Sequence, residues 1–135
     1  MDDKLYEAAL KAYHNAYTPY SKFNVGTALL LADGKIVSGS NIENASYGLS
    51  NCAERSALFA AYSQGYRKQD IKRMLVIGST DRPISPCGAC RQVMNELIDP
   101  EVEVVLTNLH GDKKIMKVRE FLPYVFSDGD LDGRV

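Results

Sequence analysis

The chain contains 135 residues, of which 45% are hydrophobic and 24% are charged, and its formal net charge at pH 7 is -1. This balance argues against a nucleic acid as the main partner, because proteins that bind polyanions usually carry a basic surplus. No apolar run approaches the roughly 20 residues of a membrane-spanning helix, and the acidic start Met1-Asp2-Asp3 is not typical of a targeting peptide. The sequence therefore predicts a single domain over residues 1–135, located in the cytoplasm and without a membrane partner.

The hydrophobic pattern predicts helices that alternate with strands. Leu5, Ala9 and Ala12 recur at helical spacing, and Asp33-Gly34 is typical of a turn between two strands. In chain order we expect a helix over 3–17, strands over 23–31 and 36–40, a helix over 53–63, a strand over 73–80, a helix over 87–98, strands over 102–107 and 115–118, and a short helix over 119–122. This order predicts an α/β fold, a three-layer α/β/α sandwich with a mixed sheet of about five strands.

Two segments lack a regular pattern. Residues 41–51 are polar and rich in turn formers, which predicts an ordered loop of the kind that carries binding groups on a rigid scaffold. Residues 127–135 are expected to form a mobile tail.

All three cysteines fall in two short motifs, Cys52-Ala-Glu54-Arg55 and Pro86-Cys87-Gly-Ala-Cys90. Cysteines kept as thiols in a reducing compartment are candidates for metal ligands. Three protein ligands on a tetrahedral zinc ion leave the fourth position for water, which distinguishes catalytic zinc from structural zinc. The motifs therefore predict a water-activating Zn²⁺ site with Cys52, Cys87 and Cys90 as its ligands.

The neighbouring residues fit this chemistry. Both motifs begin predicted helices, whose N-terminal ends lower the pKa of nearby thiols and favour three thiolates. Three thiolates would make the site anionic and weaken water activation, and the Arg55 guanidinium compensates by donating to a thiolate. Glu54 is positioned to accept and return the proton of the water as a general acid and base. Because residues 52 and 54 do not share a helix face, Cys52 must lie outside the helix, at its cap.

Other interpretations of the single motifs remain open at this point. A Cys-x-x-Cys pair alone also fits redox chemistry or structural zinc, and His14 or His110 would complete a structural site of three cysteines and one histidine. Neither histidine has ligand-like spacing, so a solvated or core position is favoured for both. A structural zinc site would leave Glu54 without a purpose.

A ligand-x-Glu followed by Pro-Cys-x-x-Cys is the signature of zinc deaminases. The resemblance extends over nearly the whole chain, through segments 19–26, 39–45, 52–58 and 85–93. Together they resemble the small cytidine deaminases of pyrimidine salvage. The three-cysteine site is similar to that of the homotetrameric branch, whereas larger dimeric relatives have a histidine as the first ligand.

The resemblance implies one zinc ion per subunit and a set of substrate-binding residues. It implies that Asn41 and Glu43 bind the ribose hydroxyls, with loop capping as the alternative role. Phe23 resembles the ring that packs on the base, and otherwise it would be ordinary core at a strand start. The remaining residues are expected to contact the base or a neighbouring subunit's site: Ala45, Tyr47, Ala53, Ser85 and Phe126. For Phe126, simple core packing is an equal alternative.

The resemblance further implies hydrolysis of cytidine and 2′-deoxycytidine to uridine and 2′-deoxyuridine, with zinc-activated water attacking C4 while Glu54 protonates N3. A small nucleoside and water are then the partners, with active sites shared in a homotetramer. A deaminase of another cytosine compound, such as an aminoacyl-nucleoside antibiotic, is the competing enzyme hypothesis, and the ribose-binding pattern Asn41-x-Glu43 disfavours it. A nucleic-acid editing protein is disfavoured by the absence of an aromatic and basic stripe.

Overall fold

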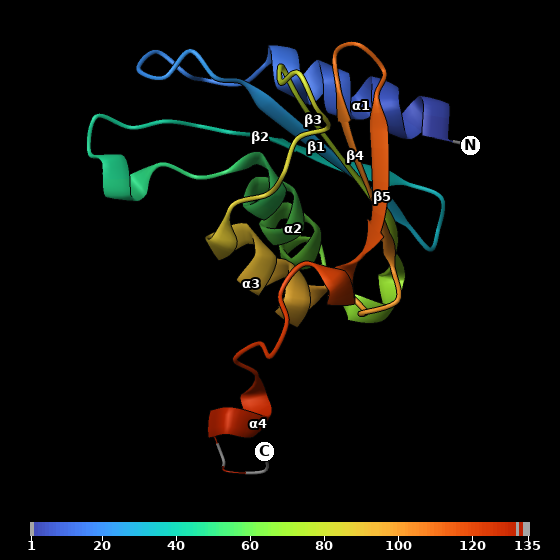
Figure 1. Ribbon diagram of the computed structural model, residues 1–135. Helices are drawn as coiled ribbons and strands as arrows, with labels where there is room; N and C mark the ends of the chain where they lie inside the picture. Colours follow the sequence, from blue (N-terminus) through green and yellow to red (C-terminus); the bar gives the residue numbers. More distant parts are fainter. Residues whose placement is uncertain (1, 132, 134–135) are drawn as a thin grey trace.

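The computed structural model describes residues 2–131 and 133 and has a three-layer architecture (Figure 1). The main helices and the strands, in chain order, are α1 Asp2–His14, β1 Val25–Leu31, β2 Ile36–Ser40, α2 Ala53–Ser63, β3 Ile71–Gly78, α3 Gly88–Leu97, β4 Glu103–Asn108, β5 Lys113–Lys117 and α4 Asp128–Leu131. Short 3-10 turns lie at Tyr47–Leu49, Lys68–Asp70 and Val118–Glu120. The predicted α/β class is confirmed, and most predicted elements are within two or three residues of their observed bounds.

The five strands form one mixed sheet in the order β2-β1-β3-β4-β5. β1 is antiparallel to both β2 and β3, β3 and β4 are parallel, and β5 is antiparallel to β4. This register brings the start of β1 and the ends of β2, β3 and β4 to one end of the sheet. Every segment that carries a predicted site residue before residue 91 leaves or enters the sheet at this end.

Helices cover both faces of the sheet, as Figure 1 shows. On one face α1 packs over a small apolar cluster: Leu5, Ala9, Ala28, Leu75, Ile77 and Val105. On the other face α2 and α3 pack over a larger cluster that includes Leu29, Leu58, Val76 and Met94. The α1 cluster uses alternate residues of the same strands, because successive side chains point to opposite faces of a sheet.

Two glycines allow the helices to approach the sheet closely. A Cβ atom at Gly26 would lie 2.0 Å from the carbonyl oxygen of Ala9 in α1. A Cβ atom at Gly39 would lie 2.4 Å from the backbone nitrogen of Ala57 in α2. Since these neighbours are backbone atoms, any side chain at either glycine would push a helix away from the sheet.

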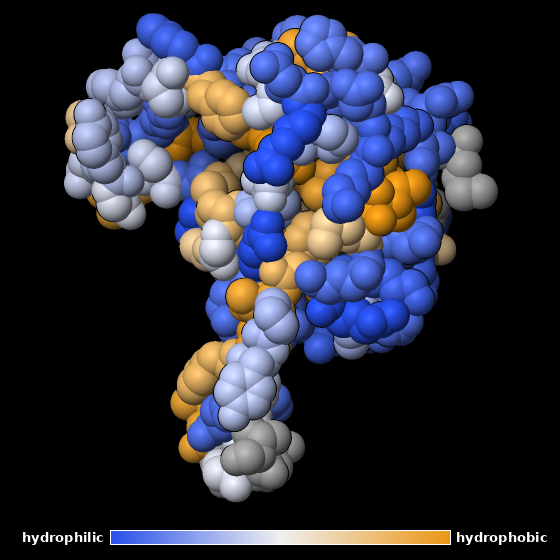
Figure 2. Space-filling view, viewed as in Figure 1, coloured by the Kyte–Doolittle hydropathy of each residue, from blue (hydrophilic) through white to orange (hydrophobic). Residues whose placement is uncertain are grey.

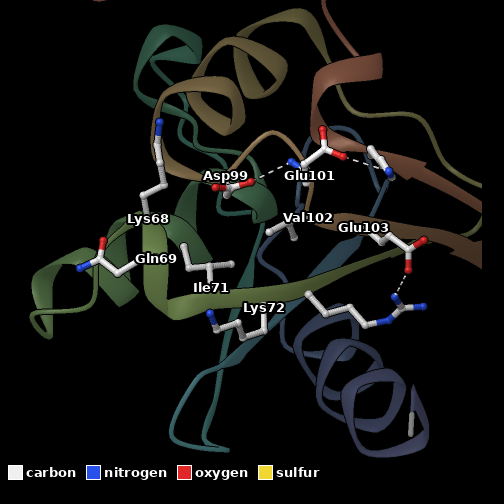
Figure 3. A pocket seen from close by; sticks show the side chains of 10 residues that line it. Lys68, Gln69, Ile71, Lys72, Asp99, Glu101, Val102 and Glu103 are labelled. Carbon is white, nitrogen blue, oxygen red and sulfur yellow. Dashed lines mark hydrogen bonds and ion pairs between the residues drawn. The ribbon is translucent and has the colours of Figure 1, made fainter.

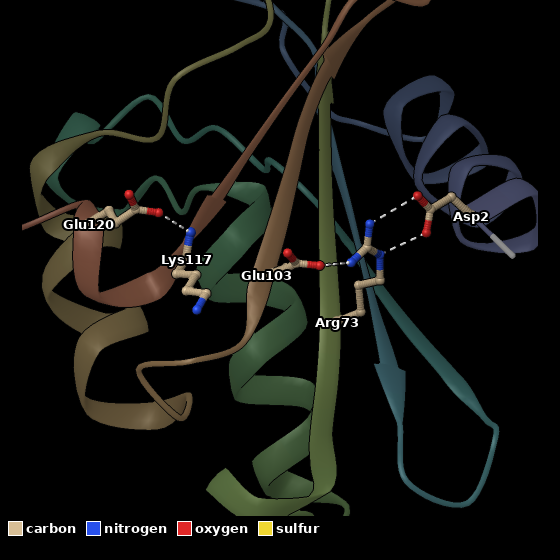
Figure 4. Close-up of polar contacts among 5 residues, drawn as sticks. All are labelled: Asp2, Arg73, Glu103, Lys117 and Glu120. Atoms are coloured by element: carbon tan, nitrogen blue, oxygen red, sulfur yellow. Dashed lines mark hydrogen bonds and ion pairs between the residues drawn. The ribbon is translucent and has the colours of Figure 1, made fainter.

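An ion-pair network fixes the start of α1 (Figure 4). The Arg73 guanidinium on β3 donates to both carboxylate oxygens of Asp2, at 2.8 and 3.2 Å, and to Glu103 on β4 at 2.8 Å. The hydrogen bond from Arg73 is the main cause of a lowered pKa at Asp2. The network therefore ties the first turn of α1 to two central strands.

β5 forms one edge of the sheet, as predicted for the fifth strand, and its sequence is strongly basic. It carries Lys113, Lys114 and Lys117 around the half-exposed Ile115. Lys117 pairs with Glu101 at 3.0 Å.

The C-terminal segment leads away from the body to α4 (Figure 1). Its side chains include Phe126 and Leu131, which are 58% and 78% exposed, and Figure 2 shows apolar side chains along it. Sequence reasoning did not anticipate the helix α4. Residues 132, 134 and 135 of the predicted mobile tail lie outside the described residues, so its mobility stays a prediction. None of the helices described is long and apolar enough to cross a membrane.

Candidate active site

Cys52 lies immediately before α2 in extended backbone, with φ -75° and ψ 155°. This confirms that the residue caps the helix and is not part of it, so helical spacing does not fix the direction of its side chain relative to Glu54. An antiparallel bridge between Ile42 and Asn51 holds the preceding loop closed. The bridge places Asn41 and Glu43, on either side of Ile42, next to the start of α2.

Cys87 caps α3 in the same manner, with extended backbone at φ -70° and ψ 167°. The helix begins at Gly88, one residue later than the sequence predicted, because the Cys87 sulfur itself accepts a hydrogen bond from the backbone nitrogen of Cys90 at 3.5 Å. Only Cys90 therefore lies in the first turn of the helix. Two helix starts nevertheless meet at the cysteines, as expected.

The three sulfur atoms lie within 4.8 Å of one another, and those of Cys52 and Cys87 are 3.8 Å apart. A tetrahedral zinc ion with Zn–S bonds of about 2.3 Å requires its sulfur ligands to be about 3.8 Å apart. Soft thiolate donors also suit zinc rather than magnesium or calcium. The donor set therefore fits one zinc ion, and His14 and His110, both exposed, are not part of this cluster.

The surroundings shift the pKa values of two of the thiols in opposite directions. Hydrogen bonding from Cys90, together with Arg55, lowers the pKa of the Cys52 thiol to about 5 despite its partial burial. The same hydrogen bond to Cys52, with burial, raises the pKa of Cys90. Because the thiolate is the zinc ligand, we expect metal binding at this cluster to release protons.

Arg55 contacts the cluster as predicted. Its Nη2 atom donates to the Cys52 sulfur at 3.2 Å. This hydrogen bond to Cys52 is also the main cause of a raised Arg55 pKa, so the guanidinium remains charged. The structure therefore places a fixed positive charge beside the sulfur cluster.

Glu54 is only 4% exposed. Burial raises its pKa to about 7, and the nearby Cys52 thiolate adds to the shift. A carboxyl group with a pKa near 7 can both accept and return a proton at neutral pH, which is the property that acid–base catalysis requires.

Two residues that the sequence analysis did not single out support the loop before Cys87. Arg91 on α3 donates to the Pro86 carbonyl at 2.9 Å and to the Ser85 hydroxyl at 2.6 Å. Asn108, fully buried at the end of β4, donates to the Thr80 carbonyl at 3.0 Å. Asn108 could have been noticed in the sequence because its polar amide directly follows the predicted strand over 102–107. For Arg91, nothing in the sequence indicated which carbonyl it would meet.

Asn41 uses its side chain to fix the start of β1. Its amide nitrogen donates to the Phe23 carbonyl at 2.8 Å, and its amide oxygen accepts from the Val25 nitrogen at 2.8 Å. Asn41 therefore caps this loop, and its side chain keeps one N–H and one lone pair that a ligand could use.

Phe23 is 40% exposed and lies just before the strand, not inside it as predicted.

Glu43 is likewise engaged with a neighbouring loop. Its carboxylate accepts hydrogen bonds from the backbone nitrogens of Tyr20 and Ser21, each at 3.1 Å, and from the Ser21 hydroxyl. Hydrogen bonding by the Ser21 hydroxyl is the main cause of a lowered Glu43 pKa. Glu43, Tyr20 and Ser21 line a hollow of about 350 Å³ together with Tyr47 and Ser50.

The other predicted substrate residues have different surroundings. Ala53, the first residue of α2, is fully buried, whereas Ser85 is exposed and held by Arg91. Ala45 is exposed, and Tyr47 is 76% exposed with its ring edge-on to that of Tyr20. The Phe126 carbonyl accepts from Gln92 on α3 at 2.9 Å, while its ring is largely exposed. The core-packing alternative for Phe126 is therefore not supported by its surroundings within the chain.

A separate hollow of about 570 Å³ lies at the opposite end of the sheet (Figure 3). Its lining includes the starts of β3 and β4, and several of its charges are already engaged: Arg73 with Glu103, and Lys117 with Glu101. It contains none of the cysteines and is distinct from the candidate site.

Residues 1–106 match the family model described as the cytidine and deoxycytidylate deaminase zinc-binding region. The chain belongs to this deaminase family. The matched residues include the three cysteines, Glu54 and Arg55, whereas Phe126 lies beyond them.

Individual members of the family are similar over nearly the full chain. A cytidine deaminase from Halalkalibacterium halodurans is 52% identical over 128 residues, covering 95% of this chain and 96% of the relative. One from Sporosarcina psychrophila is 50% identical over 129 residues, covering 96% and 93%. The crystal structure of cytidine deaminase from Burkholderia pseudomallei has a TM-score of 0.90 and 53% identity, covering 93% of this chain and 99% of that one. The family model describes a zinc-binding region, and the three-sulfur cluster lies within it and fits one zinc ion.

Proposed function

We propose that the protein is a zinc-dependent cytidine deaminase that hydrolyses cytidine and 2′-deoxycytidine to uridine and 2′-deoxyuridine with release of ammonia. The observation that carries the proposal is the buried Glu54, with a pKa near 7, beside three sulfurs whose spacing fits zinc. Membership of the deaminase family and the similarity to named cytidine deaminases support the same reaction. Pyrimidine salvage is the usual role of such an enzyme.

Zinc held by Cys52, Cys87 and Cys90 would supply a water molecule of lowered pKa as the nucleophile for C4 of the base. Glu54 accepts the proton of this water and delivers a proton to N3, which makes C4 more electrophilic. Glu54 then takes the proton of the hydroxyl group now on C4 and passes it to the amino group on C4. The C4–N bond breaks, ammonia leaves, and the C4 carbonyl of uridine remains. Arg55 keeps the thiolates from cancelling the positive charge of the metal.

We assign substrate contacts to the residues around this centre. Asn41 and Glu43 bind sugar hydroxyls with the hydrogen-bonding capacity that their loop contacts leave free. Phe23 packs on the base, and the backbone near Ala53 and Ser85 contacts its polar edge. The exposed ring of Tyr47, with Ala45, and the exposed ring of Phe126 contact the active site of a neighbouring subunit.

The last assignment implies a homotetramer with shared active sites. Large exposed apolar side chains support it, because contact with neighbouring copies would remove them from water. They include Tyr47, Leu49, Phe59 and Phe126. Light scattering at micromolar concentration should give four times the mass of the chain, and a monomer would refute the assembly.

The unpaired thiols further favour a reducing, cytoplasmic location.

The decisive experiment is an activity assay on the zinc-loaded protein. We expect loss of cytidine and 2′-deoxycytidine absorbance with one ammonia released per uridine formed. An aminoacyl-cytosine nucleoside serves as the comparison substrate and should be a much poorer one. Absence of turnover with both cytidine and 2′-deoxycytidine would refute the proposed function.

A further inference from the structure

The Ser21 hydroxyl forms hydrogen bonds with both Glu43 and Phe23, the residues assigned to the sugar and to the base of the substrate. It donates to Oε2 of Glu43 and accepts a hydrogen bond from the backbone nitrogen of Phe23 at 3.0 Å. Glu43 is assigned to the sugar and Phe23 to the base. No other described residue contacts both of them in this way through one side-chain atom.

The backbone around Ser21 is held in an uncommon conformation. Lys22 has a φ of 61°, in the left-handed region that few residues other than glycine adopt. Its nitrogen donates to the Thr18 carbonyl at 3.0 Å, which stabilises the turn. Strained backbone of this kind persists where the surrounding contacts fix it and is found preferentially at functional sites.

The contacts of Glu43 also limit how it can bind a ligand. A carboxylate has about four lone-pair sites. Three of them accept from the Tyr20 nitrogen, the Ser21 nitrogen and the Ser21 hydroxyl. One acceptor site remains, and its direction is set by the hydrogen bond that fixes Oε2. Glu43 lines the hollow of about 350 Å³.

We propose that Ser21 is a positioning residue, which orients the Glu43 carboxylate so that its one free acceptor site receives a sugar hydroxyl. The inference rests on the proposed function, since it takes a nucleoside as the substrate. Ser21 itself does not touch the reacting atoms. Its contribution to substrate binding should therefore depend on the sugar hydroxyls and on Glu43, and not on the base.

The test compares Ser21→Ala with the unmodified protein on two ligands. Cytidine has hydroxyls at the 2′ and 3′ positions, whereas 2′,3′-dideoxycytidine has the same base and keeps only the 5′ hydroxyl. We expect KM for cytidine to rise about tenfold, the usual effect of losing a hydrogen bond to a charged group. The inhibition constant of 2′,3′-dideoxycytidine against cytidine should change less than about threefold, since its sugar offers Glu43 neither a 2′ nor a 3′ hydroxyl. Ser21→Thr, which keeps the hydroxyl, should restore the KM.

A second comparison isolates Glu43. In a Glu43→Ala background, Ser21→Ala should cause no further loss specific to cytidine. Ser63→Ala, at the exposed end of α2, is the control for loss of a surface hydroxyl. Equal losses for both ligands would show that Ser21 acts through Phe23, and would overturn the proposal, as would an unchanged KM for cytidine. Absence of cytidine turnover by the unmodified protein would instead refute the proposed function on which the inference rests.

Discussion

α1 and α2 cover opposite faces of the same sheet, and each lies against a glycine of a neighbouring strand, Gly26 or Gly39. The start of α1 is fixed by the ion pair of Asp2 with Arg73. The start of α2 instead carries a thiolate ligand and a buried carboxyl group whose pKa is near 7. The two helices therefore pack against the sheet in a similar way. The start of α1 has only structural contacts, whereas the start of α2 carries the reactive groups. The comparison indicates that the side chains at the start of α2, and not its packing against the sheet, account for the difference.

The largest expected effect comes from the reactive helix. Glu54→Gln should lower kcat by about 10²–10⁴-fold, the usual contribution of acid–base catalysis, because an amide cannot relay the proton. Bound zinc, measured by metal analysis, should remain at one ion per chain. Glu7→Gln, on the exposed side of α1, is the matched control and should alter neither quantity. A Glu54→Gln variant with normal turnover would rule out the proton-transfer role.

The two glycines test the comparison most directly. Gly26→Ala and Gly39→Ala should each lower the free energy of unfolding by roughly 1–3 kcal/mol, because the added methyl group meets helix backbone. Only Gly39→Ala should also weaken zinc binding, since it displaces the helix that follows Cys52. Denaturant titrations and competition with a chelator measure the two effects. Equal loss of zinc affinity in both variants would contradict the conclusion that only the α2 face of the sheet supports the zinc site.

A smaller effect is expected at Arg55. Arg55→Gln removes the charge that contacts the Cys52 sulfur at 3.2 Å, and zinc affinity should fall about 10–100-fold, as for other residues that support metal ligands. Arg67→Gln, just beyond the other end of α2, should leave zinc affinity unchanged. Chelator competition provides the measurement, and an unaltered affinity and activity in Arg55→Gln would exclude its compensating role.

The smallest effect belongs to the structural face. Asp2→Asn should cost roughly 0.5–1 kcal/mol of stability at pH 7 without changing kcat. The pKa of Asp2 is lowered from its usual 3.8 in the folded chain. Its contribution is therefore complete above pH 3.8 and is lost as the pH falls through the lower folded value. Urea unfolding of both proteins should show a difference that shrinks below pH 3.8; a constant difference would contradict the ion-pair explanation.

The sequence predicted the parts of the site that depend on short spacings. The zinc ligands, Glu54 and Arg55 lie within two motifs of a few residues, and the apolar runs defined the strands. Contacts between distant segments were not predictable, because residue spacing says nothing about which loops meet. The hydrogen bond of Ser21 with Glu43 spans 22 residues, and that of Asn108 with Thr80 spans 28. The start of α3 differed by one residue because a cysteine sulfur serves as its cap.

The lysines of β5 have a consequence for self-association. An edge strand exposes unpaired backbone N–H and C=O groups, and another sheet can add to them and extend into aggregates. Lys113 and Lys114 would bring like charges together if β5 paired with a copy of itself. Continuous sheets across two chains are therefore disfavoured at this edge.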